Sequence, residues 1–157
     1  MNRFGNVLLI VFICTIASSA AAQNSGAVGI RAGVSGRPDQ FYAGLHYESA
    51  PFAEQLRFRP NLEVGVGSNQ TVVALNFEFA YFIALDTGRR RGVHPWSVYI
   101  GAGPALVIDR LTNNTNTGGG LNILIGAQHA GGFFTELKVG MIDSPNVKFG
   151  VGYTFRP

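Results

Sequence analysis

The sequence is poor in the features that usually hold a small exported domain together. It contains one cysteine, Cys14, which lies in an apolar stretch near the N-terminus. If that stretch is removed, the remaining chain can form no disulfide and no cysteine-ligated metal site. Charge is also scarce, because Asp, Glu, Lys and Arg make up 13% of the residues, about half the share of an ordinary soluble domain. The net charge of +3 gives no basis for nucleic-acid binding.

No apolar run reaches the roughly 20 residues that a membrane-spanning helix needs. The apolar run Val7–Ala17 follows Arg3 and is followed by the small residues Ala20-Ala21-Ala22. A positive start, a short apolar core and a small-residue end are typical of a secretory signal peptide. We therefore predict a cleaved signal peptide at residues 1–22 and one mature domain at residues 23–157.

The mature region also lacks an amphipathic helical pattern, and alternates in steps of two instead. Between Leu56 and Gly67, large apolar residues occupy one row and Arg, Asn, Glu and Gly occupy the other. This period is typical of a β-strand with different surroundings on its two faces. Turn residues divide the region into eight such runs: Ala27–Val34, Phe41–Glu48, Leu56–Gly67, Thr71–Ile83, Trp96–Ile108, Leu121–His129, Phe133–Met141 and Val147–Arg156. We predict an all-β fold, a closed eight-stranded antiparallel up-and-down barrel.

Two segments interrupt this rhythm. Pro60 lies inside the third run, and because proline cannot donate a ladder hydrogen bond we expect a bulge or a strand end there. The segment Asp109–Gly120 is rich in Asn, Thr and Gly, and we expect a loop. With the shorter turns Ser35–Gln40, Ser68–Gln70 and Ile142–Asn146 it would form one end of the barrel, and it is the best candidate for contacting an external partner.

The volume of the two rows indicates which one faces inward. A soluble carrier would place the apolar row inside, and a membrane barrel would place it outside. The interior of an eight-stranded barrel is just wide enough for its own side chains, and roughly thirty large apolar residues would overfill it. The glycine-rich row fits a narrow lumen. We therefore predict a transmembrane β-barrel whose apolar row contacts the lipid bilayer.

The inward row then carries the charged side chains of the strands: Arg31, Glu48, Arg57, Arg59, Glu63, Glu78, Glu136, Lys138 and Lys148. Arg156 falls near the mouth. Buried charges are costly unless they are paired and hydrogen-bonded, so this nearly balanced set predicts an ion-pair network that plugs the lumen. We expect Arg57 or Arg59 near Glu48 or Glu78. The alternative is a charged constriction that makes a narrow pore for ions or small solutes.

Amphipathic aromatic residues concentrate at one end of the predicted barrel. With eight strands, both chain ends lie on one side, and the following residues come near it: Tyr47, Tyr81, Trp96, Tyr153 and Phe155. This placement is typical of the interfacial girdle of a membrane barrel. The alternative is the general preference of aromatic residues for strands.

The whole mature region resembles the small eight-stranded outer-membrane barrels of Gram-negative bacteria, the OmpA/OmpX-type family. The sharpest motif is the last run, Lys148-Phe149-Gly150-Val151-Gly152-Tyr153-Thr154-Phe155, which Arg156-Pro157 follows. It is similar to the family's C-terminal insertion signal, with Gly150, Tyr153 and Phe155 in the matching positions. The resemblance implies an outer-membrane location and recognition by the barrel assembly machinery. We expect a monomer.

Some outer-membrane barrels modify lipids with a serine, a histidine and an acid, and this is the enzymatic alternative. The candidates are His46, His94 and His129 with Ser49, Ser97 or Ser144. No spacing among them sets up a triad, and three scattered histidines do not predict a metal site. We expect no catalytic residue, cofactor or metal. The basic run Arg89-Arg90-Arg91 is interpreted as a solvated loop or a site for phospholipid headgroups.

Overall fold

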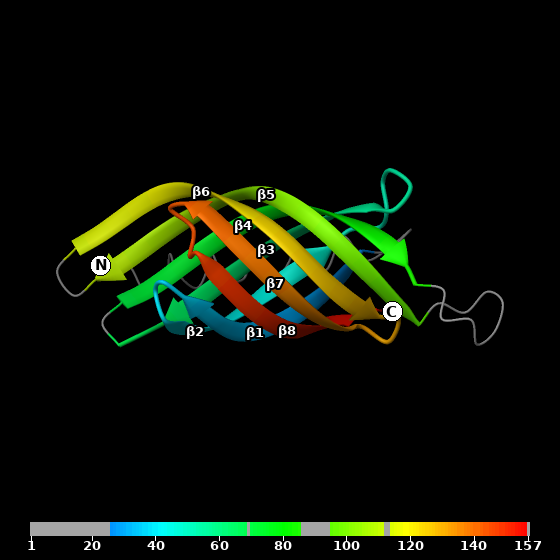
Figure 1. Cartoon of the computed structure of the whole chain (residues 1–157), viewed down its shortest axis with the longest axis horizontal. Helices are drawn as coiled ribbons and strands as arrows, with labels where there is room; N and C mark the ends of the chain where they lie inside the picture. Colours follow the sequence, from blue (N-terminus) through cyan, green and yellow to red (C-terminus); the bar gives the residue numbers. More distant parts are fainter. Residues whose placement is uncertain (1–25, 69, 86–94, 112–113, 157) are drawn as a thin grey trace, which may run out of the picture.

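The protein forms a closed β-barrel in a computed structural model, which describes residues 26–68, 70–85, 95–111 and 114–156. Its strands are β1 (Ala27–Gly36), β2 (Gln40–Glu48), β3 (Leu56–Val66), β4 (Gln70–Ala84), β5 (Trp96–Leu111), β6 (Asn114–His129), β7 (Phe133–Ile142) and β8 (Val147–Phe155). Each strand pairs antiparallel with the next, and β8 pairs with β1 (Figure 1). The predicted eight-stranded up-and-down barrel is confirmed.

The two ends of the barrel differ in the connections that they carry. The terminal end holds the start of β1, the end of β8 and the β2–β3, β4–β5 and β6–β7 connections. The opposite end holds the other turns.

The predicted signal peptide, His94 and Arg89-Arg90-Arg91 lie outside the described residues. Within the described ranges, no helix is long and apolar enough to cross a membrane.

Closure depends on a close approach of β1 and β8. Gly33 faces Gly150 in the register of these strands, and the hydroxyl of Tyr42 on β2 packs against both glycines. A Cβ atom at Gly33 would overlap the backbone carbonyl of Phe149. Glycine is therefore required at this position by backbone packing. Each described strand has a paired neighbour on both sides, so the sheet is closed.

The prediction of a loop at Asp109–Gly120 is wrong for the part of this segment that the structure describes. β5 continues to Leu111 and β6 begins at Asn114, and the two strands pair from Leu111↔Asn114 onward. β7 accompanies β6 only as far as Gly120, so the β5–β6 hairpin projects beyond the opposite end (Figure 1). The first part of β6 needs no apolar face, because it lies beyond the part of the barrel whose outer surface is apolar.

Pro60 meets the expectation of an interruption on one side only. Toward β4 the register continues through Arg59↔Glu78 and Pro60↔Phe77 without a bulge. Toward β2 the paired register ends at His46↔Asn61, and Asn61 is the residue that follows the proline. The missing N–H of Pro60 thus coincides with the end of one ladder, while β3 itself continues.

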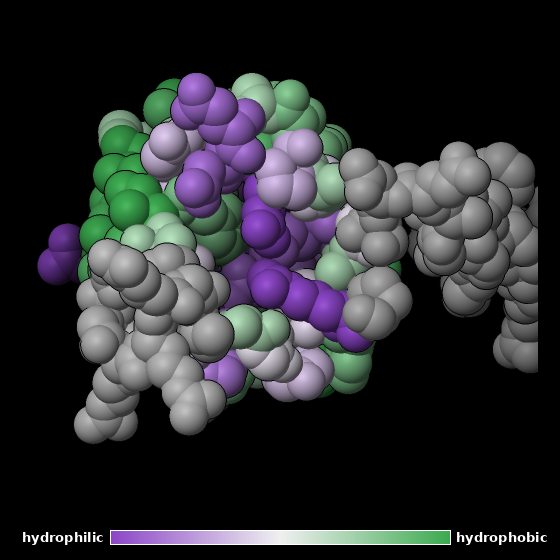
Figure 2. Space-filling model, turned by 90° about the vertical axis from the view of Figure 1, so that its right-hand side faces the viewer, coloured by the Kyte–Doolittle hydropathy of each residue, from purple (hydrophilic) through white to green (hydrophobic). Residues whose placement is uncertain are grey.

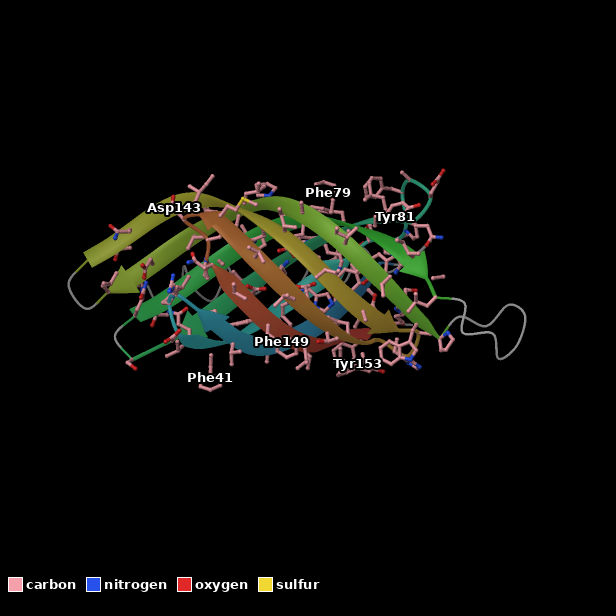
Figure 3. The ribbon with its side chains drawn as sticks, in the orientation of Figure 1. Phe41, Phe79, Tyr81, Asp143, Phe149 and Tyr153 are labelled. Carbon is pink, nitrogen blue, oxygen red and sulfur yellow. The ribbon has the colours of Figure 1, made fainter. Side chains whose placement is uncertain are left out.

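The apolar row faces outward along every strand. Ile30, Leu45 and Ile125 expose half or more of their surface, whereas Arg59 and Glu78 are 0% exposed. Phe41, Phe79, Phe149 and Tyr153 point away from the wall (Figure 3). At the terminal end, hydrophilic residues fill the centre and hydrophobic residues gather on the outer sides (Figure 2). The carrier arrangement, with the apolar row inside, is therefore excluded.

Candidate functional site

The charged lumen is the candidate site, and strand parity builds it. Six strands supply its ionisable side chains, which alternate with the outward apolar residues. The contributions are Arg31 from β1, Glu48 from β2, Arg57, Arg59 and Glu63 from β3, Glu78 from β4, Glu136 and Lys138 from β7, and Lys148 from β8. The structure therefore places all of the charged residues that sequence parity assigned to the lumen on its inner side.

Glu63 pairs with three cations from three strands. Its Oε1 accepts from Arg31 Nη1 at 3.0 Å and from Lys138 Nζ at 3.1 Å. Its Oε2 accepts from Lys148 Nζ at 2.7 Å. Lys138 and Lys148 face each other in the β7–β8 register, which would be unfavourable for like charges. Glu63 reaches from β3 to both ammonium groups and offsets that repulsion.

Glu136 joins the arginines to the lysine at the middle of the lumen. Its Oε1 lies 3.2 Å from Arg31 Nη1 and 3.8 Å from Lys138 Nζ, and its Oε2 lies 3.1 Å from Arg59 Nη1. The hydroxyl of Tyr99 donates to the same Oε2 at 2.9 Å. This carboxylate is buried, and it is satisfied by cations from three strands.

A chain of amides extends the network toward β6. Glu78 pairs with Lys138 at 2.6 Å and accepts from Asn61 Nδ2 at 2.8 Å. Asn76 donates to Asn61 Oδ1 at 2.7 Å, and Asn122 donates to Asn76 Oδ1 at 2.8 Å. Strand alternation placed Asn61 in the polar row, but none of these asparagines was assigned to the network, because the prediction followed only ionisable groups, although each has the inward parity of its strand.

Glu48 closes the network at the terminal end. It pairs with Arg57, with Arg59 Nε at 3.6 Å and with Arg156 Nη2 at 3.2 Å. Arg59 faces Glu78 in the β3–β4 register, but the ion pairs of Arg59 run to Glu48 and Glu136. Of the alternatives expected from the sequence, the structure shows the pairing of both arginines with Glu48. Shared partners connect all the charges into one network.

Aromatic rings line the terminal half of this network. The Arg59 guanidinium lies 4.7 Å from the ring centroid of Tyr99 and 5.0 Å from that of Phe134. Arg57 lies 4.6 Å from the centroid of Phe82, which stacks on Tyr99. Cation–π contacts of this kind strengthen when water is excluded. Parity could have found these inward rings, which alternate with outward neighbours.

Some lumen nitrogens have no hydrogen-bond partner among the described residues. They are Nε and Nη2 of Arg31, Nε and Nη2 of Arg59, Nε of Arg57 and Nδ1 of His46, although Arg59 Nε lies within ion-pair distance of Glu48. Buried donors of this kind are normally satisfied by protein or water. Glu48 Oε2 is likewise without a hydrogen-bond partner among the described residues, so the unsatisfied atoms of the charged groups lie mostly on the guanidinium groups and in one case on a carboxylate.

The described histidines do not assemble a catalytic group. His46 lies in the lumen, where Nε2 is 2.9 Å from Thr154 Oγ1. His129 accepts from the Gly131 amide and packs on Trp96 with centroids 5.0 Å apart. Neither ring has a hydrogen bond to a serine in the described part of the chain. No group of three or more metal-ligating side chains occurs among those residues either.

The predicted girdle residues all lie toward the terminal end, on β2, β4, β5 and β8. Tyr153 and Phe155 pack with centroids 5.2 Å apart, and Tyr81, Trp96, Tyr153 and Phe155 are exposed while Tyr47 is half-buried. Phe58 and the exposed Phe52 contact Phe79 on the same outer wall.

In the predicted insertion signal, Gly150 faces the lumen, whereas Tyr153 and Phe155 face outward. Its recognition by an assembly machinery stays a prediction.

The fold is similar to that of solved structures, including the following two. The N-terminal β-barrel domain of Pseudomonas aeruginosa OprF aligns with a TM-score of 0.56 and 13% identity, covering 85% of this chain and 98% of that chain. Neisserial surface protein A aligns with a TM-score of 0.54 and 15% identity, covering 83% of this chain and 96% of that chain. No protein-family model matches, and no curated protein matches. At these identities the likeness establishes the eight-stranded barrel fold alone.

Proposed function

We propose that the protein is an integral outer-membrane barrel with a structural or surface-interaction role, without enzymatic activity, and with a lumen closed by its ion-pair network. One observation carries the proposal: large apolar side chains cover the outside of a closed cylinder while the charges within it are paired. Ile30, Leu45 and Ile125 represent the outer wall. Arg31, Glu63 and Lys138 represent the interior.

The outer wall supports contact with lipid. Soluble monomers rarely expose a contiguous apolar patch larger than a few hundred Å², yet here every strand contributes exposed large apolar residues. A bilayer requires every backbone polar group to be satisfied within the protein, and a closed barrel meets that requirement. The aromatic residues at the terminal end have the placement of an interfacial girdle.

The outer-membrane location rests on three further supports. They are the predicted signal peptide, the likeness of the last strand to an insertion signal, and the fold shared with OprF and Neisserial surface protein A. We also propose a monomeric state and insertion by the barrel assembly machinery. In this arrangement the terminal end faces the periplasm and the opposite end, with the β5–β6 hairpin, faces outward.

Trp96 provides the test of lipid contact, because it is the only tryptophan of the chain. Its fluorescence would be measured in vesicles of lipids brominated at different depths. We expect strong quenching by bromines near the headgroups and weaker quenching by bromines at the chain ends, as for a girdle residue. A Trp96 signal that no brominated lipid quenches would contradict membrane insertion.

A narrow pore is the second candidate, and the unpartnered guanidinium nitrogens of Arg31 and Arg59 favour it, since water could satisfy them. Measurement of the current across planar bilayers distinguishes the plugged lumen from the narrow pore. The closed lumen predicts no discrete current steps for the wild-type protein. Steps in the wild-type protein that disappear in Glu78→Ala would support the pore and contradict the plug, because they would show that ions pass along the lumen and depend on its Glu78 carboxylate.

A further inference from the structure

The opposite end of the barrel contains a polar cavity that is separate from the charged network. The β7–β8 turn folds inward there, so that Ser144 is 5% exposed and Pro145 is buried. Glycines on the facing strands make room for the turn, since a Cβ atom at Gly120 would overlap the Ser144 side chain. The neighbouring Asp143 marks this turn in Figure 3. We call the cavity beneath the turn the vestibule.

The vestibule has a volume of about 210 Å³. Val72 and Val107 line it, and with Ala74 and Ala105 they form a buried apolar cluster between β4 and β5. This cluster lies between the vestibule and the charged residues deeper in the lumen. The vestibule therefore combines polar groups with apolar lining residues, which suits the binding of an amphipathic small molecule.

Two polar atoms of the vestibule are buried without a partner among the described residues. They are the Oγ of Ser144 and the Oδ1 of Asp109. The other carboxylate oxygen of Asp109 accepts a hydrogen bond from Gln70 Nε2, which fixes the group and leaves Oδ1 available. A buried unpaired acceptor of this kind costs free energy and calls for a donor.

The backbone around the vestibule is strained at two positions. Arg37 has a φ of 54° and Ile142 a φ of 65°, and both residues line the vestibule. Positive φ is unfavourable for residues with a side chain, most of all for a β-branched one such as isoleucine. Strain of this kind concentrates at ligand clamps. Both strained residues line the same cavity, which supports a binding role.

We propose that the vestibule binds a small organic ammonium ion. The ammonium group would donate to Asp109 Oδ1 and Ser144 Oγ, and its short carbon chain would pack on Val72 and Val107. Anions are disfavoured, because the described lining residues include two carboxylates, Asp109 and Asp143, against one cation, Arg37, and Asp109 is less exposed than Arg37. The volume exceeds the about 30 Å³ that one water occupies in the liquid, and it accommodates a four-carbon amine. The proposal does not depend on the barrel's function in a membrane.

The test compares three probes of the same length on the protein in detergent micelles: n-butylammonium, n-butanol and butyrate. Backbone amide shifts would be followed by NMR during each titration. We expect saturable shifts at Val107, Asp109 and Ser144 with the ammonium alone. Asp109→Asn keeps the shape and an acceptor for Gln70 but removes the charge, and it should raise the dissociation constant about tenfold or more.

Two further variants complete the design. Ser144→Ala should also weaken binding, and it provides a second route if Asp109→Asn disturbs folding. Glu54→Gln removes an exposed carboxylate in the β2–β3 connection at the terminal end and should leave binding unchanged. The absence of saturable shifts, equal shifts with butanol, or full affinity in both vestibule variants would each overturn the proposal and assign the cavity to water.

Discussion

Glu63 and the other lumen carboxylates hold their cations in an interior from which bulk water is excluded, and this makes the network sensitive to single changes. Desolvation of the charges offsets much of their mutual attraction, so the intact network adds little net stability compared with apolar packing. Removal of one partner is different, because it leaves the opposite charges buried and uncompensated. Glu63 serves three cations, Arg31, Lys138 and Lys148.

We predict that Glu63→Gln lowers the free energy of unfolding by about 3–5 kcal/mol. The substitution keeps the size of the side chain but removes the charge that these cations share. Urea titration of the protein in lipid vesicles measures the change. Glu54→Gln, at an exposed position, is the control and should stay within about 0.5 kcal/mol of the wild type. Equal stability of the two variants would mean that the lumen is hydrated and its charges are screened.

Strand parity predicted which charges face the lumen, but not which partners they choose. Glu63 and Lys148 lie on β3 and β8, which are not neighbours in the sheet, yet their side chains meet across the lumen at 2.7 Å. Register specifies neighbours along the wall only. Contacts across a filled interior depend on side-chain length and rotamer, which the alternation of residue types does not encode. The inward ring of Tyr99, whose neighbour Ile100 faces outward, was within reach of strand parity and was missed because only charged residues were followed along the inward row.

The β1–β8 junction shows how one glycine position supports closure of the sheet. A Cβ atom at Gly33 would overlap the Phe149 carbonyl, which belongs to the backbone and cannot move aside easily. Gly119, in the projecting part of β6, has nothing within 4 Å of its potential Cβ position. The two glycines therefore form a matched pair that differs in packing.

We predict that Gly33→Ala destabilises the barrel by about 1–3 kcal/mol, the usual cost of overpacking. Gly119→Ala should be neutral or stabilising by up to about 1 kcal/mol, because alanine restricts the unfolded chain. Both changes are measured by urea titration under the same conditions. A loss of stability in Gly119→Ala as large as that in Gly33→Ala would show that strand propensity, rather than packing at the junction, determines the effect.

The number and order of the strands followed from the sequence, but the length of β5 and β6 did not. Alternation of apolar and polar residues is visible only where a strand separates two media. Asn116 and Thr117 lie beyond the apolar wall, where both faces of a hairpin can be polar, and their pairing with β5 is a matter of backbone register. Turn-favouring residues in a strand of this kind give no signal that distinguishes it from a loop.

The position of the apolar wall determines the properties of the whole molecule. Leu137 is 43% exposed in β7 and faces Ile125 on one side and Phe149 on the other. The volume argument predicted this outward placement from composition alone, because a lumen of this size cannot hold so many large side chains. Which end of the barrel faces the cell exterior is not encoded by the same alternation.

We predict that Leu137→Arg costs about 2–4 kcal/mol of folding free energy in lipid vesicles, the range for a cation on the lipid-facing wall of a barrel. Thr117→Arg, on the projecting part of β6, is the control and should change stability by about 0.5 kcal/mol or less. Both are compared with the wild type by urea titration. If Leu137→Arg leaves the folding free energy unchanged, the outer wall contacts water rather than lipid.

Refolding from urea tests lipid contact by the outer wall most directly. The denatured mature chain would be diluted into buffer alone and into buffer with lipid vesicles, and the unboiled samples compared on a denaturing gel. We predict a folded band of shifted mobility only with vesicles, because lipid covers the exposed apolar wall. Without vesicles we predict aggregation, because this wall is then exposed to water. A folded, monodisperse monomer in buffer without lipid or detergent would contradict the account.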